Sequence, residues 1–275
     1  MIKISLCGFG KMNREVFNTI QANPSFQVVS ILEPHTEKNQ SDRRVPTASS
    51  GVCAHSVTTL QIVDAASSGV SNPQFVNAGT MPAHILVTDN PETAFNSCDV
   101  VIDFSTASSV LGNAEVAATL GKNIVIGTTG LDQNTVEKLR SIFARYGTSS
   151  VIASNFSIGV NIFLQTAELL SKRLPNYGVE IIDVHHQTKK DAPSGTALRT
   201  KEALARQGEV PIHSLRLGDV IGDHAVIFGG NAERIELWHR ATSRSCFAQG
   251  ALLAAKWLSG KRDGKIYTFK DVLSA

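Results

Sequence analysis

In the first half of the chain, short apolar runs alternate with longer segments of mixed polarity. Apolar runs that end in turn residues predict buried parallel strands, and they lie at 2–7, 27–32, 85–88, 99–104 and 123–126. Helical segments are predicted between them at 14–22, 91–96 and from 107 to 120. Because strands alternate with helices, the pattern predicts an α/β fold with a Rossmann-like doubly wound parallel sheet, whose ligands bind at the carboxyl ends of the strands.

The pattern changes in the second half. Residues 161–174 predict a helix with an apolar face, and shorter strands are predicted from 179 onward and at 212–217, 225–228 and 233–240. In the last strand Ile235 and Leu237 alternate with Arg234 and Glu236, which is typical of an open sheet with one packed face. We therefore expect a second α+β substrate domain built on an open mixed sheet, followed by an apolar helix at 243–258 and a closing segment at 266–273.

The segment 40–83 is rich in Ser, Thr, Asn, Gly and Ala and has weak periodicity. We interpret it as a peripheral excursion with loops, in which 57–66 forms a short helix or strand and Arg43 and Arg44 are solvated.

Composition excludes several classes of protein. The chain has 275 residues, of which 42% are hydrophobic and 18% charged, and its formal net charge of +2 gives no sign of a nucleic-acid or membrane partner. Cys7, Cys53, Cys98 and Cys246 form no C-x-x-C pair, which argues against a zinc site and a disulfide framework and fits a reducing cytoplasm. The start of the chain leads directly into a strand, without the architecture of a signal peptide, and no apolar run approaches the roughly 20 residues of a membrane span.

A glycine turn, Gly8-Phe9-Gly10-Lys11-Met12, lies between the first strand and the first helix. This is the context of a dinucleotide-binding fingerprint, in which a pyrophosphate sits on the helix N-terminus. Asn13 replaces the third glycine, so we expect a cost in helix–strand packing, and the motif alone is also compatible with a structural turn. Glu33 ends the second strand, where an acid can bond the hydroxyls of an adenine ribose.

Two further loops follow predicted strands at the same edge of the sheet, at Phe104-Ser105 and at Gly127-Thr128-Thr129. Each is a common turn by itself, but carboxyl ends of parallel strands meet at one edge. We therefore expect both loops to line the cofactor site.

Cationic side chains gather in the second half, where His185, His186, Lys189 and Lys190 precede a helix start at Ser194-Gly195-Thr196. Ser194 or Thr196 is the expected N-cap. Since a helix N-terminus offers unpaired N–H groups, the stretch predicts an anion site with proton donors, against the alternative of a solvated face. Neighbouring residues on a strand point to opposite faces, so the two adjacent histidines are a poor metal signal.

The stretch resembles the signature E-x-H-H-x-x-K-x-D-A-P-S-G-T-A of the dihydrodipicolinate reductases. The segments G-F-G-K-M, D-F-S, G-T-T-G, 153–161, 216–224 and 233–248 resemble the same family, so the likeness covers nearly the whole chain and is weakest at 40–83. One departure is a short connection between Leu204 and His213, where many members carry a longer loop.

The resemblance implies a dinucleotide-binding domain at 1–156 plus 244–275 and a substrate-binding and oligomerisation domain at 157–243, assembled as a homotetramer. It implies NAD(P)H-dependent reduction of 4-hydroxy-tetrahydrodipicolinate, a small cyclic dicarboxylate, to tetrahydrodipicolinate in lysine and diaminopimelate biosynthesis. Residues that match the family's nicotinamide-side contacts are Ala153, Ser154, Asn155 and Phe156.

The same resemblance assigns roles in the cationic stretch. His185 matches the family's proton donor, and Lys189 matches its second catalytic residue. His186 matches a substrate contact, and the backbone N–H groups of Gly195 and Thr196 can hold a substrate carboxylate.

We expect NADH and NADPH both to work, with NADH modestly favoured. Glu33 can bond the ribose hydroxyls but repels an extra phosphate, and Pro34 after it offers no charge. Lys11, His35 and Lys38 could still reach that phosphate. Two other functions remain open: another two-domain Rossmann oxidoreductase that acts on a small carboxylic acid, and a non-catalytic NAD(P)-sensing protein.

Overall fold

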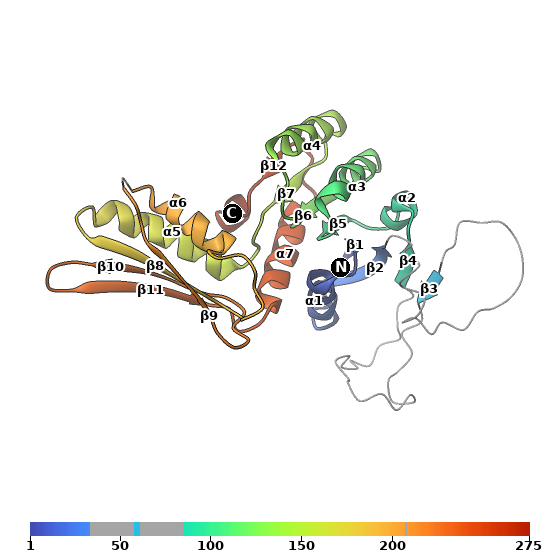
Figure 1. Ribbon diagram of the computed structural model, residues 1–275. Helices are drawn as coiled ribbons and strands as arrows, with labels where there is room; N and C mark the ends of the chain where they lie inside the picture. The colour runs from blue at the N-terminus through green and yellow to red at the C-terminus, as the bar shows by residue number, and fades with distance from the viewer. Residues whose placement is uncertain (34–57, 61–84, 207) are drawn as a thin grey trace, which may run out of the picture. The chain divides into compact units, whose positions relative to one another are not determined.

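The computed structural model describes residues 1–33, 58–60, 85–206 and 208–275 (Figure 1). The chain divides into two compact units, Met1–Ser154 with Ala251–Ala275 and Asn155–Gly250. Most of the segment 40–83, with Arg43 and Arg44, lies outside the described residues, as do Pro34, His35 and Lys38. None of the described helices has the length and apolar character that a membrane crossing requires.

The first unit is built on an eight-stranded sheet in the order β12-β7-β6-β5-β1-β2-β4-β3. Its strands are β1 (Ile2–Cys7), β2 (Phe26–Leu32), β3 (Thr58–Leu60), β4 (Ile85–Thr88), β5 (Val100–Asp103), β6 (Asn123–Ile126), β7 (Ser150–Ile152) and β12 (Ile266–Tyr267). Every pairing is parallel except that of β3 with β4. The predicted Rossmann-like sheet is therefore confirmed.

The helices of this unit are α1 (Lys11–Gln21), α2 (Pro91–Phe95), α3 (Ala107–Thr119), α4 (Gln133–Tyr146) and α8 (Phe269–Leu273), and α7 (Ser245–Leu258) ends in it. No element was predicted between 131 and 152, so α4 and β7 were missed. The signals for α4 were present: the Asp132 carboxylate accepts a hydrogen bond from the Thr135 N–H at 2.7 Å, and Gly147 ends the helix in the left-handed conformation.

The core of the first unit explains its continuous apolar runs. All four residues of β5 and of β6 are buried, because helices cover both faces of a parallel sheet. Asn123, at the start of β6, fastens the returning C-terminal segment to this core. Its side-chain amide donates to the carbonyl oxygens of Leu258 at 2.7 Å and Lys261 at 2.9 Å, and its Oδ1 accepts from the Ser149 N–H at 2.8 Å.

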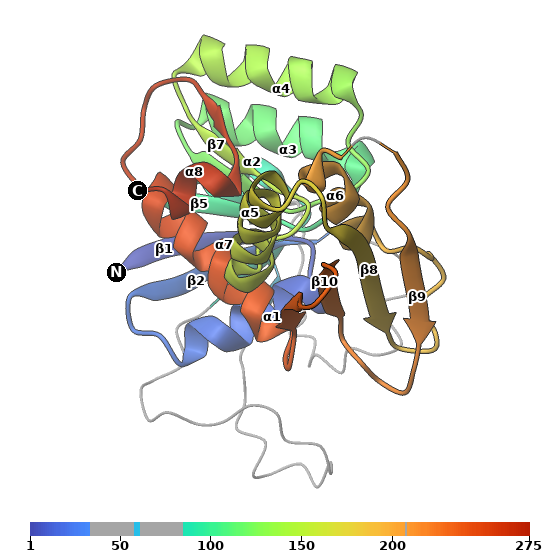
Figure 2. The ribbon, with the colours of Figure 1, turned by 90° about the vertical axis from the view of Figure 1, so that its left-hand side faces the viewer.

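The second unit carries a four-stranded sheet in the order β11-β10-β8-β9. Its strands are β8 (Gly178–His185), β9 (Ile212–Arg216), β10 (Asp223–Gly229) and β11 (Arg234–Arg240), and its helices are α5 (Ile158–Arg173) and α6 (Gly195–Leu204). Strands β8 and β9 run side by side and parallel (Figure 2), whereas β10 is antiparallel to both of its neighbours. The predicted open mixed sheet is therefore confirmed.

One face of this sheet is packed against α5 and α6. Val179 and Ile181 of β8 lie in a buried cluster with Phe163 of α5 and Ala197 of α6. Because side chains alternate along a strand, Glu180 points to the other face, where it pairs with His213 at 2.7 Å. The alternation predicted for 233–240 is also observed, since Leu237 of β11 pairs with the buried Val226 on the helix-covered face.

Candidate functional site

The glycine turn between β1 and α1 leaves the N-terminus of α1 open. Gly8 has a φ of +78°, a left-handed conformation that strains any other L-residue. Gly10 is the N-cap of α1 and provides no side-chain hydrogen bond to it, and a Cβ added at Gly10 would meet no atom within 4 Å. No side chain of Gly10 therefore caps the N–H groups of the first helical turn, and these groups can donate hydrogen bonds to a bound pyrophosphate.

Asn13, at the position of the third glycine of the fingerprint, makes hydrogen bonds that the sequence did not predict. Its side chain is buried, and its amide donates to the carbonyl oxygens of Cys7 at 2.7 Å and Gly8 at 2.8 Å. Asn13 therefore ties the end of β1 to the glycine turn from the first turn of α1.

A buried carboxylate that was not among the predicted site residues joins the two other predicted cofactor loops. Asp103 ends β5 and is 0% exposed. Its Oδ1 accepts from the Ser105 N–H at 2.8 Å, the Ser105 hydroxyl at 2.6 Å and the Thr128 hydroxyl at 2.9 Å. The Asn113 amide donates to Oδ2 at 2.8 Å. One carboxylate thus positions the loop after β5 relative to the loop after β6.

The same two loops are in close contact through Phe104 and Gly127. A Cβ added at Gly127 would lie 2.1 Å from Cε1 of the Phe104 ring, so only glycine lets the ring lie against this backbone. A Cβ added at Gly8 would lie 3.6 Å from the Cα of Ser105. The glycine turn and the Phe104 loop are therefore neighbours.

The structure brings several predicted cofactor residues to one edge of the first sheet. Strands β7, β6, β5, β1 and β2 are adjacent and parallel, so their carboxyl ends meet there. The residues that follow these ends are Gly8, Glu33, Phe104, Gly127 and Ala153. The Glu33 N–H donates to Thr88 O at 3.0 Å, and the Ala153 N–H donates to Ile126 O at 3.1 Å.

The predicted nicotinamide-side residues fall on both sides of the division between the units. Ala153 and Ser154 end the first part of the first unit, whereas Asn155 and Phe156 begin the second. Phe156 is buried within the second unit. The side-chain oxygen of Asn155 accepts from the Ser157 N–H at 2.8 Å, and its amide lies 3.5 Å from the hydroxyl of Thr196.

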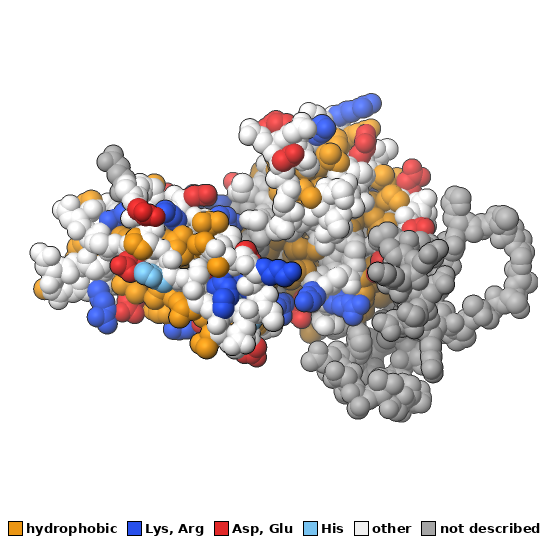
Figure 3. Space-filling model, in the orientation of Figure 1, with side chains coloured by type: hydrophobic (Ala, Val, Ile, Leu, Met, Phe, Trp, Pro, Cys, Tyr) orange, Lys and Arg blue, Asp and Glu red, His pale blue; other side chains and the backbone are white. Residues whose placement is uncertain are grey.

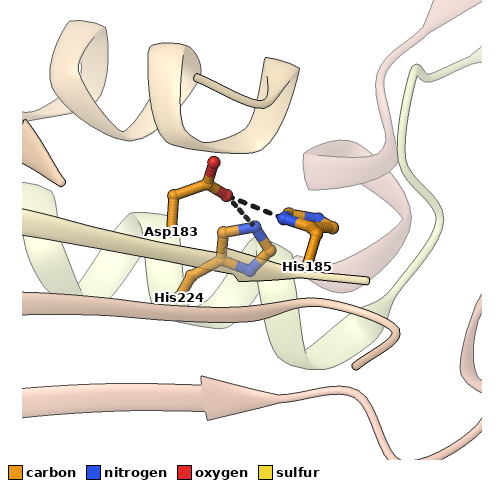
Figure 4. Close-up of side chains that lie close together, drawn as sticks. All are labelled: Asp183, His185 and His224. Atoms are coloured by element: carbon orange, nitrogen blue, oxygen red, sulfur yellow. Dashed lines mark ion pairs between the residues drawn. The ribbon is translucent and has the colours of Figure 1, made fainter. Parts of the chain in front are cut away.

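In the second unit, Asp183 is the centre of a buried polar cluster (Figure 4). Val179 and Ile181 bring apolar side chains to the helix-covered face of β8, and the alternation then places Asp183 and His185 on that same face. Asp183 is 0% exposed, and its Oδ1 lies 3.0 Å from Nδ1 of His185 and 3.6 Å from Nε2 of His224.

Strand register assembles the rest of this cluster. His224 of β10 and Ser214 of β9 lie directly across from Asp183 on its two sides, and Arg216 lies across from His185. The Ser214 hydroxyl donates to Oδ2 of Asp183 at 3.3 Å, and Nη2 of Arg216 does so at 3.5 Å. Asp183 is therefore linked to both neighbouring strands.

Asp183 also holds the start of α6. The Ser194 hydroxyl donates to Oδ1 of Asp183 at 2.7 Å, and the Ser194 N–H donates to Oδ2 at 3.0 Å. Ser194 is the N-cap, because its side chain accepts from the Ala197 N–H, so the choice between Ser194 and Thr196 is settled. Gly195 and Thr196 form the first turn, and a Cβ added at Gly195 would meet no atom within 4 Å.

The other cationic residues of the stretch are more accessible than His185. His185 is buried, whereas His186 and Lys189 are half-buried and Lys190 is exposed. Nδ1 of His186 hydrogen-bonds the Thr188 hydroxyl at 2.8 Å, and Nζ of Lys189 lies 2.8 Å from Oδ1 of Asp191. The two adjacent histidines therefore have different surroundings.

The environment sets the charge states within the cluster. Burial alone would raise the pKa of Asp183, but the hydrogen bonds from His185 and Ser194 outweigh it and hold the pKa of this carboxyl below its usual range. Burial, together with the neighbouring charge of His185, lowers the pKa of His224 to about 4. Near neutral pH the cluster therefore contains an ionised Asp183 and an uncharged His224.

Four supporting residues were not predicted from the sequence: Asp103, Asp183, Arg216 and His224. All four stand in segments compared with the family, and Asp183, at the first position of the signature, lies two residues before His185 on a predicted strand. That spacing puts the side chains of Asp183 and His185 on one face of the strand, so it could have identified Asp183 as a site residue.

Comparisons with known proteins cover both units. The model of "Dihydrodipicolinate reductase, N-terminus" matches residues 2–156, and the model of "Dihydrodipicolinate reductase, C-terminus" matches residues 159–273. A 4-hydroxy-tetrahydrodipicolinate reductase of Methanococcus aeolicus is 39% identical over 228 residues, which are 75% of this chain and 84% of that protein. One of Methanocaldococcus jannaschii is 45% identical over 195 residues, which are 64% of this chain and 71% of that protein.

A solved structure has the same fold. It is a dipicolinate-bound dihydrodipicolinate reductase from Paenisporosarcina sp. TG-14, with a TM-score of 0.75 and 24% identity, and the alignment covers 98% of this chain and 99% of that chain.

We predict that Gly10→Ala weakens dinucleotide binding without unfolding the first unit. The new Cβ meets no protein atom but projects where a pyrophosphate approaches the start of α1, so the dissociation constant should rise roughly tenfold, about 1.4 kcal/mol. The free energy of unfolding should change by less than about 1 kcal/mol. Calorimetric titration and urea denaturation measure the two quantities.

The matched control is Gly112→Ala, on an exposed part of α3 with open space around it. It should stabilise the helix by about 0.5–1 kcal/mol and leave dinucleotide binding unchanged. Equal affinity in wild type and Gly10→Ala would show that the pyrophosphate does not bind at this turn.

Proposed function

Because the chain belongs to the dihydrodipicolinate reductase family, we propose that it reduces 4-hydroxy-tetrahydrodipicolinate to tetrahydrodipicolinate in lysine and diaminopimelate biosynthesis. The observation that carries this proposal is the buried Asp183 cluster, which places an imidazole beside the start of a helix. The reaction adds a proton to the ring of a small dicarboxylate. It therefore requires a proton donor, which the imidazole provides, close to an anion-binding group, which the helix start provides. The nicotinamide cofactor supplies the hydride when it is bound.

His185 is the proposed proton donor. Its Nδ1 is directed toward the ionised Asp183, so Nε2 is the nitrogen left to donate a proton to the substrate. The contact with Asp183 fixes the orientation of the His185 ring. A Cβ added at Gly222 would lie 3.1 Å from Nε2, and glycine at this position keeps that nitrogen accessible.

Substrate carboxylates are bound at the start of α6 and by Lys189. The N–H groups of Gly195 and Thr196 lie in the first turn of the helix, where the helix dipole favours an anion. Lys189 pairs with the exposed Asp191 and can exchange it for a substrate carboxylate. Its charge also stabilises negative charge that develops as the hydride arrives, and His186 is the further substrate contact.

We predict that His185→Gln and Lys189→Ala each slow turnover by about 10²–10⁴, the usual loss when a proton donor or an electrostatic partner is removed. The dissociation constant of the nicotinamide cofactor should not change, because the glycine turn is intact in both variants. Stopped-flow measurement of cofactor oxidation and fluorescence titration of cofactor binding test the two parts.

Lys190→Ala is the matched control, because Lys190 is adjacent to Lys189 but exposed. It should keep turnover within about twofold, in line with the small contribution of solvated charges. Turnover near that of wild type in His185→Gln would rule out His185 as the proton donor.

Both NADH and NADPH serve as cofactors in this proposal, with NADH modestly favoured. Glu33 follows β2 at the edge where the glycine turn lies, and its charge disfavours an extra phosphate on the ribose. Lys11, exposed at the start of α1, opposes that preference.

We therefore predict that the ratio of the two Michaelis constants is about fivefold or less, because exposed charge contacts contribute about 1 kcal/mol or less. Michaelis constants for both cofactors, at low and moderate salt, measure this ratio. A strong NADPH preference that disappears in Lys11→Ala would show that the lysine outweighs Glu33.

The open face of the second sheet is the proposed surface for assembly into a homotetramer. Trp238 is 37% exposed and Leu215 is 45% exposed, and both lie on strand positions that point away from α5 and α6. Hydrophobic side chains are visible on the surface of this unit in Figure 3. An apolar face of this kind is stabilised when another copy covers it.

We predict that Leu215→Glu dissociates the assembly, because it places a charge in a buried interface. Sedimentation velocity measures the change in mass. Leu169→Glu is the control, since Leu169 is 54% exposed but lies on α5, over the other face of the sheet. Identical sedimentation of wild type and Leu215→Glu would exclude this face as the interface.

We assign the protein to the cytoplasm on its cysteine chemistry. Cys7, Cys98 and Cys246, the cysteines of the described residues, are free thiols, as is usual in a reducing compartment. Cell fractionation checks the assignment.

A further inference from the structure

His224 has more hydrogen-bonding capacity than the described residues satisfy. Its side chain is 4% exposed, and neither ring nitrogen has a hydrogen-bond partner in the described part of the chain. Nε2 points at Oδ1 of Asp183 from 3.6 Å, which is longer than a hydrogen bond (Figure 4). Buried polar groups normally have partners, so this imidazole indicates a ligand that the proton-transfer role of His185 does not explain.

We propose that Asp183, His185 and His224 bind a divalent transition-metal ion, with Zn²⁺ as the preferred ion. One donor atom from each residue lies within 4.8 Å of the other two. Oδ1 of Asp183 lies 3.0 Å from Nδ1 of His185 and 3.6 Å from Nε2 of His224. Zinc–ligand bonds of about 2.0–2.2 Å place neighbouring donors roughly 3.0–3.5 Å apart, so small side-chain movements suffice.

The donor chemistry selects the ion. Two imidazoles and one carboxylate suit Zn²⁺ and Co²⁺, whereas Mg²⁺ and Ca²⁺ prefer sets of oxygen atoms. His224 offers Nε2 toward the carboxylate from a side chain that is 4% exposed, so the donor is held in place by burial. The Ser194 hydroxyl, 2.7 Å from Oδ1 of Asp183, orients the carboxylate from outside the site.

Nearby positive charges limit the affinity. Nη2 of Arg216 lies 3.5 Å from Oδ2 of Asp183, the carboxylate oxygen that neither histidine contacts. Lys189 adds positive charge that acts on His224. With three protein donors and these two cations, the site should bind zinc more weakly than a four-ligand structural site, and it leaves a coordination position for water or a substrate carboxylate.

The bound ion inhibits reduction, a consequence that rests on the proposed role of His185. Binding at Nδ1 displaces any proton from that nitrogen, and the ring then cannot become the doubly protonated imidazole that donates from Nε2. Zinc should therefore lower kcat while the cofactor still binds at the glycine turn of the other unit.

Titration with Co²⁺, followed by its visible absorption, tests the site directly, and calorimetry with Zn²⁺ gives the stoichiometry. Wild type should bind one ion per chain with the absorption of a low-coordinate site. His224→Gln and Asp183→Asn should each weaken binding at least tenfold. His186→Gln is the matched control and should bind as wild type does, because His186 adjoins His185 in sequence but contacts Thr188 instead.

Circular dichroism and cofactor titration establish that each variant is folded. If His224→Gln or Asp183→Asn does not fold, His185→Gln is tested in its place. Lack of saturable binding at one ion per chain overturns the proposal, as does unchanged affinity in His224→Gln. If the ion binds as predicted but does not inhibit, the metal site stands and the role of His185 as proton donor is wrong. The two failures are thus distinguishable.

Discussion

The buried carboxylate of Asp183 is the interaction on which the second unit depends. A carboxylate removed from water is costly unless several donors surround it. Here the donors come from a helix start through Ser194, from β9 through Ser214 and Arg216, and from His185 on its own strand. Because the charge needs these partners together, burying it also fixes the distance between the imidazole and the first turn of α6.

The first unit has a comparable arrangement at Asp103. This carboxylate is also fully buried at the end of an apolar strand, and it accepts hydrogen bonds from the loops after β5 and β6. In both units an apolar strand carries a buried aspartate near its carboxyl end. Asp103 and Asp183 order the neighbouring segments through hydrogen bonds. The loops that carry proposed ligand-binding residues are thus held by charge-assisted hydrogen bonds to a buried aspartate.

Sequence patterns predicted the fold well where they were long or repeated. The apolar runs at 99–104 and 123–126 were correctly predicted as buried parallel strands, because a strand that is buried on both faces is almost continuously apolar. Helix α4 was missed even though Asp132 and Gly147 mark its ends. The candidate site was predicted only in part, since the linear stretch from His185 to Thr196 contains its ligand-facing groups but not His224 or Ser214. Those two reach Asp183 through strand register, which no local pattern specifies.

The course of the chain has a consequence for biosynthesis. Strand β12 and helix α8 come last in the sequence, yet β12 pairs with β7 at the edge of the first sheet, and Asn123 bonds the carbonyls that precede it. During translation the whole second unit emerges before β12 is available, so the edge of β7 remains unpaired throughout that interval. Unpaired strand edges promote association between nascent chains. A chain that ends after the second unit would therefore keep an open sheet edge at β7, because the strand that covers it is encoded last.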